Sequence, residues 1–302
     1  MAAKWLYKKG ELTSPGWDLH LDATASPLAE IKHVGIRIGT VSNSNSLKIT
    51  ADSQERTIFV LDGGDVSVEI SHAGNTESVT LRGRESVFSG PTDHLYVPIN
   101  SSVEITGSAR IAVGEAPAKN VKPISLLKRE DVPVFIRGAG RETRQVHNFG
   151  MPDNLDADRF IVVEVIVPAG NWSGAPAHKH DTYIAGKESN LEELYYFESA
   201  LERGRKATGP IDPVGYVRGY ASDHREFDIT AEVRSGDLLL VPHGWHGPVA
   251  AAPGYDLYFF NVMAGPDPVR EWNVTDDPHH AWIRESWKDQ TPDPRLPYTS
   301  EK

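Results

Sequence analysis

Two histidines, His178 and His180, stand one residue apart in the stretch GNWSGAPAHKHD, which covers residues 170 to 181. This stretch follows FIVVEVIV (160–167), a run typical of a β-strand. Because alternate residues of an extended chain point the same way, HKH would aim two imidazoles at one point and leave Lys179 on the other face. Neutral imidazole is a common metal ligand, so the pattern indicates two ligands of a metal site, although surface histidines are commoner.

Two further segments supply more ligands. Glu193 begins the strand-like run ELYYF, where it shares a face with Tyr195 and Phe197. Far downstream, the Pro and Gly of VPHGWH (241–246) predict a turn that presents His246 from a different strand. Four ligands spread over several strands would leave a coordination position open, as in metal sites that take part in a reaction. The predicted ligands of one divalent ion (Zn, Mn, Fe, Ni or Co) are His178, His180, Glu193 and His246.

Short strands must hold these residues. Runs rich in Val, Ile, Tyr and Phe alternate with Gly, Pro, Asn and Asp along most of the chain, which predicts an all-β protein of sandwiches or barrels. This strand pattern occurs in both halves of the chain: HLYVPINSSVEI (94–105) can be aligned with LLLVPHGWHGPV (238–249). In that register Ser102 falls where the second half has His246. The halves are therefore similar to a duplicated fold in which one copy keeps a metal site.

Composition narrows the class of protein. Of 302 residues, 39% are hydrophobic and 24% charged, which is typical of a globular protein. No apolar run approaches the ~20 residues that span a bilayer, no secretion signal is evident and cysteine is absent, so we expect a cytoplasmic protein. The net charge of −11 argues against nucleic acid or an anionic membrane as a partner. A small anionic substrate remains possible, because a local arginine can bind it.

The ligand pattern carries a family resemblance. An HxH, a Glu that opens the next strand and a later P-x-G turn with a His resemble the two motifs of the cupin family. Two departures are the long insert DTYIAGKESNLE before Glu193 and one residue fewer between the last Gly and His. A narrower group, the 5-deoxy-glucuronate isomerases of myo-inositol catabolism (inositol-operon B-type proteins), shares them. The resembling segments are GNWS, P-HKHD, LEELYYF, LVPHGWHGPVAAAPGYDLYFFNVMAGP, DDPHHAW, GRESVF and RQV-N.

This resemblance, which runs over nearly the whole chain, implies a bicupin: two double-stranded β-helix (jelly-roll) barrels in one chain. We expect an N-terminal barrel without a metal site over residues 1–125. A C-terminal barrel with the metal site and a polar tail would cover residues 126–302. The implied reaction converts 5-deoxy-D-glucuronate to 5-dehydro-2-deoxy-D-gluconate. Two alternatives stay open on the same ligands, a bicupin iron dioxygenase and a sugar-acid-binding cupin without catalysis.

An aldose–ketose isomerase needs a general base near the C2 proton of its substrate, unless a hydride shifts from C2 to C1. With Glu193 used as a ligand, the candidates are Glu164, His243 and Tyr195. Glu164 lies inside an apolar run, where a carboxylate is costly unless it is catalytic or paired with an arginine. More ordinary roles are exposure on the turn for His243 and strand packing for Tyr195.

The substrate's far end is a carboxylate, which favours a bidentate arginine. The candidates are Arg144, Arg159 and Arg218, and the sequence does not rank them. His279 and His280, in the polar tail, are weaker candidates for contact with the site, and His94 is expected to be structural. A homo-oligomer is expected on general grounds, because closed symmetric assemblies are common among soluble enzymes.

Overall fold

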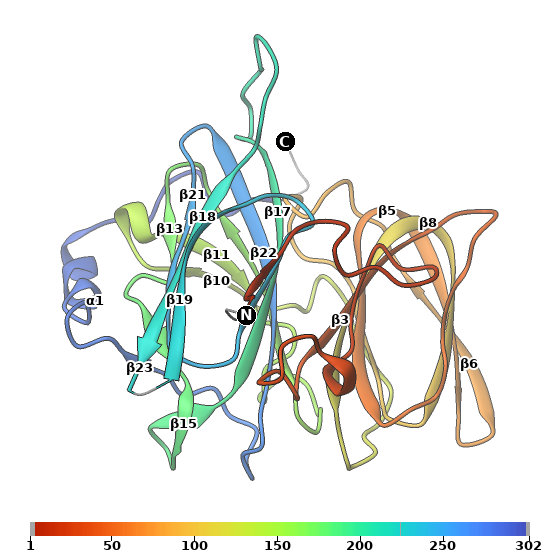
Figure 1. Ribbon diagram of the computed structural model, residues 1–302. Coiled ribbons are helices and arrows are strands. Elements are labelled where there is room, and N and C mark those ends of the chain that lie inside the picture. The colour runs from red at the N-terminus through yellow and green to blue at the C-terminus, as the bar shows by residue number, and fades with distance from the viewer. Residues whose placement is uncertain (1–3, 224, 300–302) are drawn as a thin grey trace.

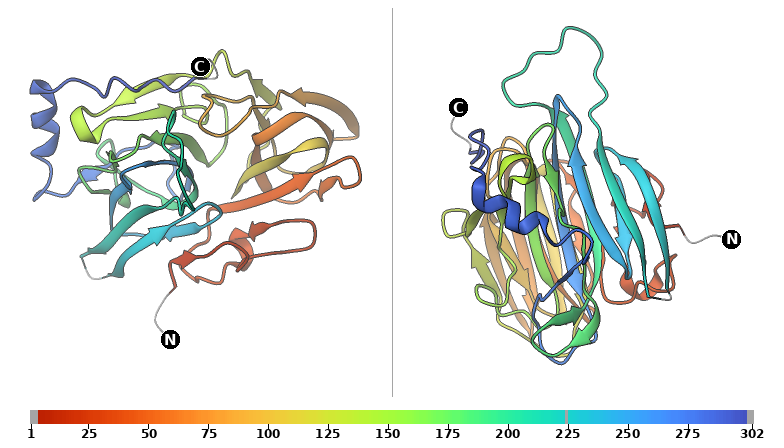
Figure 2. Two further views of the ribbon diagram at one scale, coloured as in Figure 1. Left: turned by 90° about the horizontal axis from the view of Figure 1, so that it is seen from above. Right: turned by 90° about the vertical axis from the view of Figure 1, so that its left-hand side faces the viewer.

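The structure, a computed structural model, describes residues 4–223 and 225–299. Most of its regular structure is β-strand, arranged as two barrels that lie side by side (Figures 1 and 2). This confirms the predicted all-β fold with two barrels in one chain. Within the described ranges, none of the helices is long and apolar enough to cross a bilayer. The helical segments are η1 (Ala23–Ala25), η2 (Gly140–Glu142), α1 (Ile283–Ser286) and η3 (Trp287–Asp289).

The N-terminal barrel is one sheet with the strand order β2-β3-β8-β5-β7-β9, to which β4 adds on β8 and β6 on β5. Its strands are β2 (Leu19–Leu21), β3 (Gly35–Val41), β4 (Leu47–Ile49), β5 (Gln54–His72), β6 (Asn75–Leu81), β7 (His94–Val97), β8 (Ser101–Pro117) and β9 (Ser125–Leu127). Register shifts bend the long β5 against β8 on either side of Gly63. Gly63 has φ +114°, and a Cβ there would lie 2.6 Å from the Cα of Ala109, so only glycine fits this bend.

The C-terminal barrel has two facing sheets. One sheet has the order β1-β20-β17-β22-β12-β11-β10, and the other has the order β19-β18-β21-β14-β23 with β13 on β21. Strands β15 and β16 form a separate hairpin. The strands are β1 (Leu6–Tyr7), β10 (Val134–Arg137), β11 (Arg144–His147), β12 (Ile161–Val167), β13 (Trp172–Ser173), β14 (His178–Lys179), β15 (Asp181–Ile184), β16 (Glu188–Asn190), β17 (Glu192–Leu201), β18 (Gly215–Ser222), β19 (Arg225–Val233), β20 (Leu238–Val241), β21 (Trp245–Ala251), β22 (Tyr255–Ala264) and β23 (Thr275–Asp276).

Three hydrophobic clusters follow from strand alternation. Ile58 of β5 packs inside the N-terminal barrel, and Tyr195 of β17 packs inside the C-terminal barrel. Their chain neighbours Phe59 and Tyr196 point the other way, into a third cluster that lies between the barrels. The part of each barrel that faces the other barrel is therefore buried on both faces. This arrangement decides which side chains can reach the interior of the C-terminal barrel.

The chain crosses between the barrels at both ends. Strand β1 pairs with β20 of the C-terminal barrel, although β2 to β9 belong to the other barrel. Tyr298, near the C-terminal end, is buried in the cluster between the barrels. Along the chain, β9 is the last strand of the N-terminal sheet and β10 is the first to follow it in the C-terminal barrel. The division of the domains at residue 125 stays a prediction.

Candidate metal centre

The three predicted histidines meet at one point of the C-terminal barrel. His178 on β14 lies directly opposite His246 on β21, because the two strands pair antiparallel at this position. His180 follows after Lys179, and the alternation of the extended chain turns it to the same side as His178. The nitrogen atoms that these three side chains offer all lie within 4.8 Å of one another. The spacing inferred from the sequence thus gathers three imidazoles.

Glu193 faces this histidine group from the opposite sheet. Its Oε2 atom lies 3.0 Å from His180 Nε2 and 3.1 Å from His246 Nε2. The carboxylate is buried, with 1% of its side chain exposed. It reaches the barrel interior because it shares the inner face of β17 with Tyr195. Three imidazoles and one carboxylate therefore form one compact set.

Backbone carbonyls orient the imidazoles. His180 donates from Nδ1 to the carbonyl of Leu191 at 3.0 Å, and His246 donates from Nδ1 to that of Gly244 at 3.1 Å. Both rings therefore direct Nε2 toward the centre of the group, where His180 donates from this atom to Oε2 of Glu193. The Nε2 atom of His246 is buried and has no hydrogen-bond partner among the described residues. A buried nitrogen without a partner, beside a carboxylate, fits a bound divalent cation.

The charges of the group also suit a cation. Burial, with the nearby imidazoles of His246 and His180, holds the pKa of His178 well below its usual range, so this ring is neutral. Burial alone would raise the pKa of Glu193, but the hydrogen bond from His180 and the nearby imidazole of His246 outweigh it and keep the pKa low. Burial likewise opposes a charge on His180, yet the Glu193 hydrogen bond raises its pKa. A cation bound between His180 and Glu193 would replace that proton.

Tyr195 and Asn261 form the wall beside Glu193. They are direct cross-strand neighbours on β17 and β22, and burial together with the nearby Glu193 carboxylate raises the pKa of the Tyr195 hydroxyl well above its usual range. The amide nitrogen of Asn261 donates to Oε1 of Glu193. Its carbonyl oxygen is buried and has no hydrogen-bond partner within the described ranges. Asn261 was not among the predicted site residues, although an amide inside the apolar run LYFFNVMA was a visible signal.

Comparison with known proteins identifies the family of this chain. Residues 5–283 match the model of the KduI/IolB family. The chain belongs to the KduI/IolB family. Relatives named 5-deoxy-glucuronate isomerase include one from Geobacillus thermodenitrificans, 37% identical over 84% of this chain and 88% of the relative. Another, from Halalkalibacterium halodurans, is 37% identical over 90% of this chain and 95% of the relative.

Solved structures support the fold of this KduI/IolB chain. An IolB-like protein from Salmonella typhimurium has a TM-score of 0.79 and 32% identity, over 93% of this chain and 99% of the other. An oxalate decarboxylase from Lactobacillus farciminis has a TM-score of 0.62 over 91% of this chain and 89% of the other. At 9% identity, this second likeness shows the fold alone. The expected bicupin architecture is confirmed.

Glu164, the first candidate base, lies away from the histidine group of this family member. It sits on the face of β12 that points between the barrels, where its carboxylate pairs with Arg84 at 2.5 Å. Tyr258 and His147 donate to the same carboxylate at 2.5 and 3.1 Å. The observed contacts match the alternative of a buried ion pair. Glu164 therefore points away from the interior of the C-terminal barrel, where Glu193 lies.

His243, the second candidate, lies beside a hollow of about 500 Å³ that Glu192 and Arg225 also line. Its Nε2 donates to the carbonyl of Glu226 at 3.0 Å, so this ring nitrogen is already used. His243 is buried rather than exposed, and the structure does not bring it to the histidine group. Of the three candidates, only Tyr195 stands at the centre.

The three arginine candidates also lie elsewhere. Arg144 begins β11 level with the C-terminal end of β12, roughly 20 Å along the sheet from Glu193, and its guanidinium stacks on Trp287. Arg159 donates to the carbonyl of Asp267 at 2.9 Å. Arg218 lies over the ring of Tyr220 on the outer face of β18. None of these guanidinium groups joins the four predicted ligands.

The other three histidines considered in the sequence also fall outside the group. His279 bonds to Asp277 at 3.0 Å with 89% of its side chain exposed. His280 lines a small outer hollow of about 200 Å³ with Arg218. His94 is buried between the barrels, stacked on Phe149. Its surroundings are those of a packing residue.

Proposed function

We propose that this chain is a 5-deoxy-glucuronate isomerase whose activity depends on a divalent metal ion held by His178, His180, Glu193 and His246. The observation that carries the proposal is the buried group of three inward-facing imidazoles and one carboxylate, with the unpartnered Nε2 atom of His246. The isomerase names of relatives that align over most of the chain support the substrate and the reaction.

The reaction moves a carbonyl group from C1 to C2 of a sugar acid. A proton leaves C2 and one is added at C1, or a hydride shifts between them. When bound, a divalent ion would polarise the carbonyl and stabilise negative charge on the sugar oxygens. The metal identity is open among Zn, Mn, Fe, Ni and Co, since a mixed nitrogen and oxygen ligand set suits each of them.

The neighbouring residues have complementary roles. Tyr195, through its hydroxyl, holds a proton beside Glu193 and can donate it to a sugar oxygen. Asn261 fixes Oε1 of Glu193 with its amide nitrogen, which leaves Oε2 for the metal. Its unpartnered carbonyl oxygen can accept a hydrogen bond from a sugar hydroxyl. The apolar residues around them exclude water.

The test is turnover of 5-deoxy-D-glucuronate without oxygen, by protein loaded with one metal at a time. We expect conversion to 5-dehydro-2-deoxy-D-gluconate with at least one metal and none after chelation. For a product formed in deuterated water, deuterium on the carbon that was C1 of the substrate (C6 in the numbering of the product) would indicate proton transfer, and its absence would favour a hydride shift. Turnover that required oxygen would favour the dioxygenase. Binding of the sugar acid without conversion by any metal form would favour the non-catalytic cupin.

A further inference from the structure

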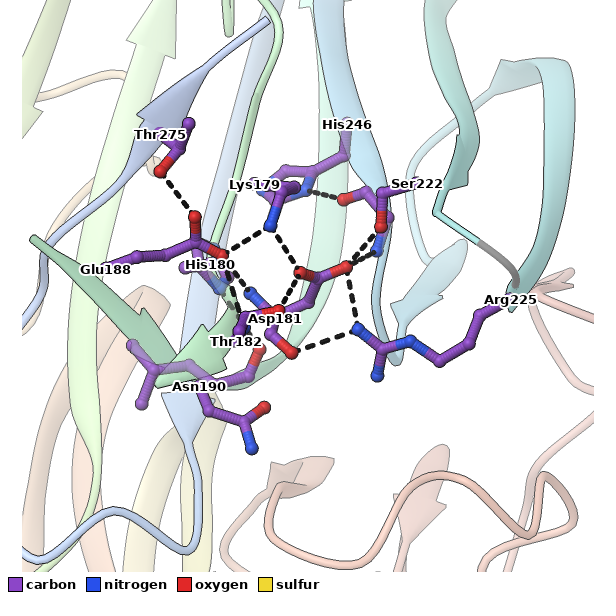
Figure 3. Close-up of polar contacts among 12 residues, drawn as sticks. Lys179, His180, Asp181, Thr182, Glu188, Asn190, Ser222, Arg225, His246 and Thr275 are labelled. Atoms are coloured by element: carbon purple, nitrogen blue, oxygen red, sulfur yellow. Dashed lines mark hydrogen bonds and ion pairs between the residues drawn. The ribbon is translucent and has the colours of Figure 1, made fainter. Parts of the chain in front are cut away.

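The outward side of the HKHD segment carries a buried carboxylate, Asp181, that the proposed reaction does not use (Figure 3). We propose that Asp181 is a positioning residue that holds His180 and His246 at the separation required for metal binding. The inference rests on the proposed metal dependence and assigns a role to a residue that does not itself touch the metal.

The contacts of Asp181 join segments that are distant in sequence. Oδ2 accepts from the backbone N–H of Gly244 at 2.9 Å, from Ser222 Oγ at 2.5 Å and from Arg225 Nη2 at 2.8 Å. Oδ1 accepts from Lys179 Nζ at 2.8 Å. One carboxylate thus connects the His180 segment with the turn before β21 and with the β18–β19 hairpin (Figure 3).

A short path leads from Asp181 to His246. Gly244 gives its N–H to Asp181, and its carbonyl accepts the Nδ1 proton of His246 at 3.1 Å. Gly244 has φ +89°, and a Cβ there would lie 2.8 Å from the Tyr220 carbonyl oxygen, so glycine is required. The turn that orients His246 is therefore fixed on one side by the residue that directly follows His180.

Lys179 and Glu188 secure the other side of the segment. Lys179 Nζ lies 2.8 Å from Asp181 and 2.6 Å from Glu188, and the second oxygen of Glu188 accepts from Thr275 on β23. The two carboxylates are balanced by Lys179 and Arg225, so the buried charges are paired. This balance holds β14, which carries His178, against β23.

The isosteric variant Asp181→Asn tests the inference sharply. Every group that contacts the carboxylate is a hydrogen-bond donor, so an amide –NH₂ must face donors on one side. We expect Co²⁺ affinity to fall about 10- to 100-fold, the range seen when groups that support metal ligands are changed. The visible absorption bands of bound Co²⁺ should shift as well, because the ligand geometry relaxes. Near-ultraviolet circular dichroism of the metal-free protein should match the wild type.

Asp212→Asn is the matched control, because Asp212 is an exposed carboxylate that pairs with Arg234. Its Co²⁺ affinity and spectrum should equal those of the wild type. Ser222→Ala, which removes one hydrogen-bond donor to Asp181, is the test to use if Asp181→Asn fails to fold. In this variant a several-fold weaker Co²⁺ affinity supports the inference, and an unchanged affinity overturns it. Wild-type affinity in a folded Asp181→Asn protein would overturn it too. A wild-type protein that bound no Co²⁺ would instead overturn the proposed metal dependence, and the inference with it.

Discussion

At the scale of single residues, hydrogen bonds decide what each imidazole can do. The carbonyls of Leu191 and Gly244 accept the Nδ1 protons of His180 and His246, which turns each Nε2 toward the centre of the group. His178 is neutral because burial and two neighbouring rings oppose a charge on it. Inward-facing ring nitrogens beside a buried carboxylate are costly to bury unless a proton or a metal cation lies between them.

His178→Ala and His246→Ala should each lose most of the bound metal and most activity while the barrel stays folded, because each removes one ligand from a small set. Metal content by mass spectrometry and circular dichroism are the measurements. His72→Ala, in the N-terminal barrel, is the control and should keep its metal. Full metal occupancy in either ligand variant would rule out the ligand assignment.

Tyr195→Phe should retain metal but lose about 10²- to 10⁴-fold in kcat, the range for a lost general acid or base. Its chain neighbour Tyr196 is the matched control. Tyr196 faces the cluster between the barrels and donates to Glu198 at 2.7 Å, so Tyr196→Phe should keep kcat. The readouts are kcat and metal content in both variants. Unchanged kcat in Tyr195→Phe would remove this hydroxyl from the reaction.

The sequence allowed these inner residues to be predicted only where a strand pattern set their direction. His178, His180 and Glu193 follow the period-two alternation of extended chain, and the family resemblance supplied their common purpose. Arg159 shows the limit, since its partner, the carbonyl of Asp267, comes from a distant segment. Asn261 could have been noticed, but only the fold places its amide beside Glu193.

At the scale of elements, β12 shows why Glu164 could not be assigned from sequence. All seven residues of this strand are buried, so neither face is marked as polar. A strand buried on both faces gives no alternation from which to tell the barrel interior from the space between the barrels. The structure decides it through Arg84, which comes from a loop of the N-terminal barrel. Glu164 therefore joins the two barrels.

Glu164→Gln should keep kcat in the folded protein and lower the free energy of unfolding by about 3–5 kcal/mol, because Arg84 is left buried without its counter-charge. Burial would raise the pKa of Glu164, but Arg84 and His147 outweigh it and hold that pKa well below its ordinary value. The carboxylate therefore stabilises the wild type above the ordinary pKa of about 4.5, and this stability is lost as the pH falls below it.

Urea unfolding between pH 7 and pH 3 checks both points. The wild type should lose more stability than Glu164→Gln over the acid end of this range, since the variant has no carboxylate to protonate at this position. Glu77→Gln, on the exposed strand β6, is the control for a generic charge change. Wild-type stability combined with a large loss of kcat would restore Glu164 as the base.

The equivalent strands of the two barrels carry opposite charges at one position. Arg56 on β5 lies opposite Val97 on β7, as Glu193 on β17 lies opposite Val241 on β20. Arg56 is fully buried and pairs with Glu115 at 2.7 Å and with Asp52 at 2.5 Å. At this position the N-terminal barrel has the cationic side chain of Arg56. The C-terminal barrel instead has Glu193, the proposed anionic ligand of a metal cation.

At the scale of the whole molecule, this difference predicts that metal removal loosens one barrel only. Metal that binds the folded state at about 100 times its Kd adds about 2.7 kcal/mol of stability, which a chelator removes. Hydrogen–deuterium exchange should then rise in β14, β17 and β21 but not in β5, β7 and β8, because Arg56 stays in place. An equal rise in both barrels, or no change in either, would contradict this prediction.

The position of β1 has a consequence for how the protein is made. Leu6 pairs with Leu239, so more than 200 residues separate the two partners. A ribosome that adds about 5–20 residues each second must work for many seconds after β1 has been synthesised before β20 exists. During synthesis, the strands of the N-terminal barrel can pair with one another while β1 still waits for its neighbour. The edge of the sheet that carries Glu193 is therefore closed by a segment made long before its partner strand, and it can be closed only after β20 has been synthesised.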